Sequence, residues 1–141
     1  MSKQLTLDIL TPERSACCVE AEIVIARAMD GEIGILANHA PLVVALDIAP
    51  LRYRKDGVEH AVAVCGGFLE VKDNRVTVLT SGAETETEID FARAEAARER
   101  AEKRLAGPPT PEIDVQRAQL ALRRAMMRLQ IAQNIRRQTH R

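Results

Sequence analysis

The chain has 141 residues, enough for one or two small domains with a modest core. Aromatic residues make up only 2% of it, with no tryptophan, and the 20 basic residues balance the 20 acidic ones. This composition argues against nucleic-acid binding through an overall basic charge or an aromatic stacking platform.

Up to about residue 83, apolar and polar residues alternate, which is the pattern of strands with one buried face. The alternating runs lie at 5–9, 19–25, 58–64, 68–71 and 76–79. Turn-forming residues separate them: Asp30-Gly31, Lys55-Asp56-Gly57, Gly66-Gly67 and Asp73-Asn74. Short strands with frequent turns and no helical pattern between them predict an antiparallel sandwich or barrel.

The segment GEIGILANHAPLVVAL, Gly31–Leu46, is almost uncharged. The least charged window of the chain, 33–48, contains Gly34, His39, Pro41 and Asp47 and is too short and too interrupted to span a membrane. We interpret it as a strand, a tight turn and a corner before the next buried strand. His39 at that corner is then a structural or interface residue rather than a catalytic one.

Nothing in the sequence predicts a catalytic or metal site. The cysteines are Cys17, Cys18 and Cys65, and they do not form the paired spacing of zinc ligands. No GxSxG, HExxH or phosphate-binding glycine loop is present. A small enzyme that depends on Cys65 or His39 stays open as an alternative.

After Gly82 the composition changes to alanine, arginine and glutamate, which are good helix formers. The sequence AGPPTP at 106–111 must interrupt a helix, and Thr110 with Pro111 would begin the next one. Two helices are therefore predicted, at about 88–105 and 111–136. They repeat each other at an offset of 24, with 10 of 18 positions identical between 88–105 and 112–129. The alanines of the repeat form a stripe, so a closely packed but marginally stable antiparallel hairpin is expected.

The two parts of the chain carry opposite charges. Residues 1–87 have 8 basic and 13 acidic residues, a net of −5, whereas residues 88–141 have 12 and 7, a net of +5. Arg93, Arg100 and Arg104 recur as Arg117, Arg124 and Arg128. A solvent-exposed face with Glu–Arg pairs would explain such arginines, but the second helix has no acid after Asp114. A phosphate or an acidic protein surface is the alternative partner.

Three motifs, in this order and spacing, resemble the epsilon subunit of F-type ATP synthase. They are GEIGILANHAPLVVAL, then GGFLEV at 66–71 with VTVLT at 76–80, then EIDFARA at 88–94. The resemblance covers nearly the whole chain and departs from the family at Ala37 and Ala49-Pro50. It implies an α+β fold, with an N-terminal antiparallel β-sandwich at 1–84 followed by a C-terminal antiparallel α-helical hairpin at 85–141.

The resemblance also implies a non-catalytic rotor subunit of the central stalk, which couples proton or other ion translocation to ATP synthesis. The sandwich would contact the gamma subunit near His39 and the c-ring near Glu32. The hairpin would inhibit ATP hydrolysis when it extends toward the alpha and beta subunits of the catalytic head. The subunit would be peripheral, at the cytoplasmic face of the bacterial inner membrane, with no nucleic-acid partner.

In some bacterial members of this family the hairpin binds a regulatory ATP through the motif I/L-D-x-x-R-A, which matches Ile89–Ala94. No cofactor is required. The positions that the resemblance assigns to ATP are Glu84, Ile89, Asp90, Arg93, Ala94, Arg100, Arg124 and Arg128. A free-standing nucleotide-sensing regulatory protein is the alternative function.

Overall fold

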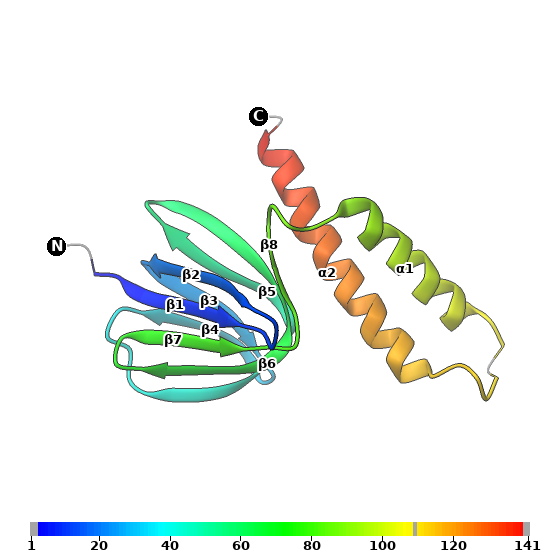
Figure 1. Ribbon diagram of the computed structural model, residues 1–141, viewed down its shortest axis with the longest axis horizontal. Helices are drawn as coiled ribbons and strands as arrows, with labels where there is room; N and C mark the ends of the chain where they lie inside the picture. Colours follow the sequence, from blue (N-terminus) through cyan, green and yellow to red (C-terminus); the bar gives the residue numbers. More distant parts are fainter. Residues whose placement is uncertain (1–2, 109, 140–141) are drawn as a thin grey trace. The chain divides into compact units, whose positions relative to one another are not determined.

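The computed structural model describes residues 3–108 and 110–139 and divides the chain into two compact units (Figure 1). One unit ends at Thr87 and the other begins at Glu88, slightly beyond the boundary predicted after residue 84. Pro109, in the predicted helix break, and the last two residues of the predicted second domain lie outside the described residues. Strands form the first unit and helices the second, so the predicted fold is confirmed.

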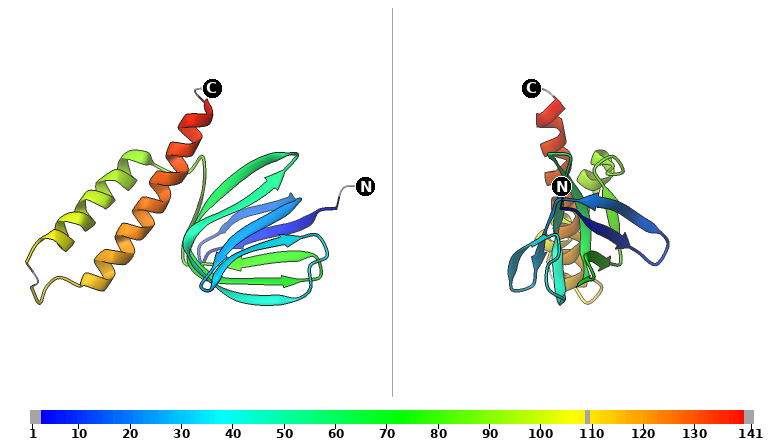
Figure 2. Two further views of the ribbon diagram at one scale, coloured as in Figure 1. Left: turned by 180° about the vertical axis from the view of Figure 1, so that it is seen from behind. Right: turned by 90° about the vertical axis from the view of Figure 1, so that its left-hand side faces the viewer.

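Eight strands are found in the described part of the first unit. They are β1 (Leu5–Leu10), β2 (Ser15–Ala21), β3 (Ile23–Ala28), β4 (Gly31–Leu36), β5 (Leu42–Lys55), β6 (Val58–Lys72), β7 (Arg75–Leu79) and β8 (Ala83–Thr85). Their order in the sheet is β2-β1-β7-β6-β5-β3-β4, with β8 beside β6. Figure 2 shows the sheet bending over so that β1 and β2 lie across from β3 and β4, which produces the two layers of a sandwich.

The core follows from the alternation in the sequence. Leu5, Leu7 and Ile9 of β1 are fully buried, while the residues between them are partly exposed. The same alternation places Val76 and Val78 of β7 inside. Burial of each such side chain stabilises the fold by about 1.5–3 kcal/mol. β1 and β7 pair in parallel, and every other ladder of the described strands is antiparallel.

Two strand boundaries differ from the sequence prediction. The run at 19–25 is not one strand, because the chain turns at Glu22, whose backbone N–H donates to the carbonyl of Arg54. The glycine pair Gly66-Gly67 was predicted to be a turn and lies instead inside β6. Both glycines have positive φ, 76° and 110°, so they bend the long strand without ending it.

The second unit contains α1 (Phe91–Ala106) and α2 (Val115–Thr139), which run side by side as an antiparallel pair in both figures. The predicted stripes contain buried alanines in both helices: Ala94, Ala101, Ala118 and Ala125. The prediction that α2 begins after Thr110 was wrong, because the helix starts only at Val115. Among the described residues, neither helix is long and apolar enough to cross a membrane.

Candidate functional site

An exposed apolar row crosses three neighbouring strands of the sandwich. Phe68 of β6 pairs in register with Ala45 of β5 on one side and with Leu79 of β7 on the other. Val43 lies two residues before Ala45 and therefore on the same face of β5. Phe68, Leu79 and Val43 are 59%, 55% and 68% exposed. We call Val43, Ala45, Phe68 and Leu79 the apolar row, and contiguous exposed apolar groups of this kind mark interaction surfaces.

A shallow pocket of roughly 500 Å³ adjoins the row at Leu79. Its walls come from the end of β1, the bend of β6 and the segment after β7: Leu10, Thr11, Pro12, Cys65, Gly67, Leu79, Thr80 and Ser81. The row and the pocket together give a surface with an apolar ridge and a hollow beside it. That shape suits a protein partner better than a small molecule.

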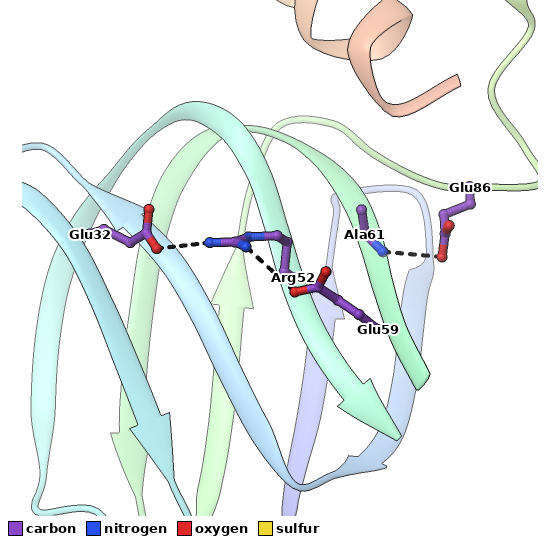
Figure 3. Close-up of polar contacts among 5 residues, drawn as sticks. All are labelled: Glu32, Arg52, Glu59, Ala61 and Glu86. Carbon is purple, nitrogen blue, oxygen red and sulfur yellow. Dashed lines mark hydrogen bonds and ion pairs between the residues drawn. The ribbon is translucent and has the colours of Figure 1, made fainter. Parts of the chain in front are cut away.

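Glu32 on β4 takes part in a surface network of charged side chains (Figure 3). Its Oε1 accepts a hydrogen bond of 2.8 Å from the guanidinium of Arg52, which also contacts Glu59 at 3.4 Å. These side chains are about 40–55% exposed, so each pair contributes at most about 1 kcal/mol. Arg27 lies opposite Glu32 and Arg54 lies opposite Glu59 in the sheet, so this surface carries charges of both signs.

The corner at His39 is fixed by hydrogen bonds within the sandwich. The backbone N–H of His39 donates to the carbonyl of Leu36, and its Nδ1 donates to the carbonyl of Ala40 at 2.7 Å. Asn38 has a φ of 64°, and its N–H donates to the side chain of Asn74 between β6 and β7. The imidazole therefore bonds within its own turn, and no metal-ligand cluster of His, Cys, Asp or Glu occurs in the described residues.

The motif assigned to ATP forms the start of α1. The Asp90 carboxylate accepts a hydrogen bond of 3.1 Å from the backbone N–H of Arg93, which is an N-cap. Asp114 caps α2 in the same way through the N–H of Arg117, at 3.0 Å. This explains the repeated Ile-Asp-x-x-Arg-Ala sequence and the late start of α2. The aspartate of the motif has a structural role whether or not a nucleotide binds.

The other residues assigned to ATP have varied surroundings. Ala94 is buried and Ile89 is half-buried, so they contribute packing. The side chains of Arg93 and Arg100 on α1 are exposed and have no hydrogen bond or ion pair within the described structure. Arg124 and Arg128 lie on α2 and are partly buried. Glu84 belongs to β8 in the other unit.

Two family models cover almost the entire chain. The model described as "ATP synthase, Delta/Epsilon chain, beta-sandwich domain" matches residues 4–86, and "ATP synthase, Delta/Epsilon chain, long alpha-helix domain" matches residues 87–133. The chain belongs to the family of ATP synthase epsilon chains. The family resemblance found in the sequence is therefore confirmed.

Bacterial epsilon chains are similar along their full length. That of Desulforamulus reducens is 47% identical over 133 residues, covering 94% of this chain and 100% of the relative. That of Desulfitobacterium hafniense (strain Y51) is 46% identical over 134 residues, covering 95% and 100%. That of Symbiobacterium thermophilum is 50% identical over 129 residues, covering 91% and 92%.

Solved ATP synthases contain chains of similar fold. A chain in the OSCP/F1/c-ring structure of the Euglena gracilis mitochondrial enzyme superposes with a TM-score of 0.72 at 25% identity, covering 86% of this chain and 76% of that one. A chain in the central stalk/c-ring structure from Tetrahymena thermophila has a TM-score of 0.55 at 14% identity, covering 92% and 94%. The second similarity concerns the fold alone.

The sequence interpretation missed the apolar row, although the sequence contains a sign of it. Phe68 and Leu69 are adjacent, as are Val78 and Leu79, and adjacent residues of a strand point to opposite faces. One member of each pair must then be exposed, and the structure buries Leu69 and Val78. The alternation identified the strands but did not show that the exposed members stand side by side.

Proposed function

We propose that this epsilon chain is a non-catalytic subunit of the central stalk, whose sandwich binds the gamma subunit and the c-ring. The apolar row is the observation that carries this proposal. It places an aromatic side chain between aliphatic ones on an exposed face, which is the composition of an interface centre. The Euglena neighbour, from a structure of OSCP, F1 and c-ring, supports the assignment.

Glu32 and His39 belong to the margin of the proposed interface. The Glu32–Arg52–Glu59 network offers exposed charges, and we assign it to polar loops of the c-ring. The His39 corner is rigid because Asn74 holds it, and we assign it to gamma. The complex would lie at the cytoplasmic face of a bacterial inner membrane, with this subunit attached only through its protein partners.

Phe68→Glu should weaken binding to gamma by at least 30-fold. The substitution places a charge at the centre of an apolar interface, and single residues at such centres commonly contribute about 2 kcal/mol or more to binding. The measurement is the affinity of the full chain for gamma, together with co-purification of the complex. Val58→Glu is the matched control, since Val58 lies on the same strand and is 56% exposed but outside the row. Equal affinities of the two variants would contradict this docking surface.

We further propose that the helical unit senses ATP. Arg93 and Arg100 project exposed guanidinium groups from α1, and guanidinium groups bind phosphate oxygens strongly. The caps at Asp90 and Asp114 hold the first turn of each helix in the same conformation. The nucleotide would be a regulatory ligand and not a substrate.

Arg93→Ala should weaken ATP binding by about 1.5–3 kcal/mol, the usual contribution of a hydrogen bond to a charged group. Isothermal calorimetry on the full chain measures this directly. Arg117→Ala is the control, because Arg117 follows the same cap on α2 but is not assigned to the site. The backbone N–H groups that make the caps are unaffected in both variants. If the unmodified chain gives no binding heat at millimolar ATP, the site does not exist.

A further inference from the structure

Glu86 fastens the end of the sandwich to β6. Its Oε1 accepts a hydrogen bond of 3.1 Å from the backbone N–H of Ala61 (Figure 3). The same oxygen accepts a hydrogen bond of 3.1 Å from Nδ1 of His60. The backbone ladder between β8 and β6 stops just before this point, with Thr85 opposite Val62. The carboxylate therefore replaces the missing strand as the acceptor for Ala61, and its side chain is only 22% exposed.

The other end of β8 is also held by a side chain. The guanidinium of Arg14, between β1 and β2, donates to the carbonyl of Ala83 at 3.0 Å. Just before it, the N–H of Cys65 donates to the carbonyl of Gly82. β8 itself has only three residues, fewer than the five or six of a common strand. The side chains of Arg14 and Glu86 therefore add hydrogen bonds at its two ends, beyond its ladder with β6 and the burial of Ala83 in the core.

The imidazole of His60, which donates to Glu86, is also stacked on the ring of Tyr53. Tyr53 on β5 pairs with His60 in register, and the two rings stack with centroids 5.1 Å apart and planes 21° apart. Burial, reinforced by the neighbouring Cys17 thiol, raises the pKa of Tyr53 to about 12, so the ring stays neutral. The stacked phenol holds the imidazole flat, with Nδ1 toward Glu86.

We propose that Glu86, with His60 and Ala61, is a latch that sets the length of the connection to the helices. With the latch closed, residues 87–90 remain before α1, and four residues span at most roughly 14 Å. If the latch opens and β8 separates from β6, the connection lengthens to residues 83–90, which doubles its greatest span to roughly 28 Å. The reach of the helices then depends on one carboxylate. The regulatory consequence rests on the extension of the helices toward the catalytic head that the family resemblance implies, whereas the latch itself does not.

Amide hydrogen exchange on the full chain tests the latch. In Glu86→Ala, exchange at Ala61 and within β8 should become at least 10-fold faster, because the N–H of Ala61 loses its acceptor. Glu86→Gln should stay within about 3-fold of the unmodified chain, since its amide oxygen accepts the same two hydrogen bonds. The control is Glu20→Ala, which removes an exposed carboxylate that accepts from Thr6 on the neighbouring strand.

The core amides of β1 and β7 report on the fold as a whole. If they accelerate as much as those of β8, the substitution acts globally and the latch is refuted; unchanged exchange at Ala61 refutes it as well. A second arm uses the assembled ATP synthase, in which Glu86→Ala should lower ATP hydrolysis because the helices reach further. If exchange at Ala61 rises and hydrolysis does not change, the latch stands and its regulatory consequence is wrong.

Discussion

Gly67→Ala is expected to destabilise the sandwich by about 3 kcal/mol or more, a large part of the stability of a small domain. Gly67 has a φ of 110°, which residues with a side chain rarely adopt, at a cost of about 1–3 kcal/mol. A Cβ there would also overlap the carbonyl oxygen of Leu79 and lie 2.9 Å from Cα of Thr80. Since both are backbone atoms, no side-chain rotation relieves the overlap, and the β6–β7 pairing must separate.

Gly57→Ala separates the cost of the positive φ from the cost of the steric overlap. Gly57 also has a positive φ, 77°, but a Cβ there has no atom within 4 Å. Its substitution should cost only the backbone strain, about 1–2 kcal/mol. Urea denaturation of both variants gives the comparison. A loss at Gly67 no greater than that at Gly57 would mean that the close contact with Leu79 is absent in solution.

This glycine pair also shows how sequence and structure differ in what they reveal. Two adjacent glycines between apolar runs predict a turn, since glycine is frequent in turns. A strand that bends sharply needs the same residues, and the local sequence does not distinguish a reversal from a bend. The pairing settles the question, because β6 pairs with β5 on both sides of the bend, with β8 before it and with β7 after it. That pairing joins residues that are distant in the sequence.

Other features of the chain also divide into those that the local sequence predicts and those that it does not. Alternation and the helical repeat were enough for the fold, because burial follows local periodicity. The start of α2 was missed because Thr110-Pro111 and Asp114 are both acceptable caps, and only the structure selects Asp114. The Glu86 latch gave no sign in the sequence, since it joins Glu86 to residues some 25 positions earlier. The parallel pairing of β1 with β7 was hidden for the same reason.

Removal of residues 112–141 should raise ATP hydrolysis by the assembled enzyme several-fold while ATP synthesis stays largely intact. The reason is the charge of the second helix, which has no acidic residue after Asp114. We expect this basic surface to contact either of two acidic surfaces: the sandwich, with a net charge of −5, or the acidic loops of the catalytic subunits that the family resemblance implies. If the inhibitory state is favoured by about 1.4 kcal/mol, roughly nine tenths of the enzyme is inactive, and removal gives a roughly 10-fold gain.

Replacement of Arg123 and Arg124 by alanine should give part of this increase, and high salt should act in the same direction, because it screens exposed charges. Alanine at Arg54 and Lys55 is the control, since it removes two adjacent, exposed basic residues from the sandwich. Steady-state hydrolysis by membrane vesicles is the measurement, with ATP synthesis in the same vesicles to verify coupling.

The alanine stripes favour a switch between an inhibitory and a non-inhibitory arrangement of the helices. They bury little apolar area, so a few charge contacts can decide between the two arrangements. Hydrolysis that is unchanged after the full deletion would show that these helices do not inhibit the enzyme.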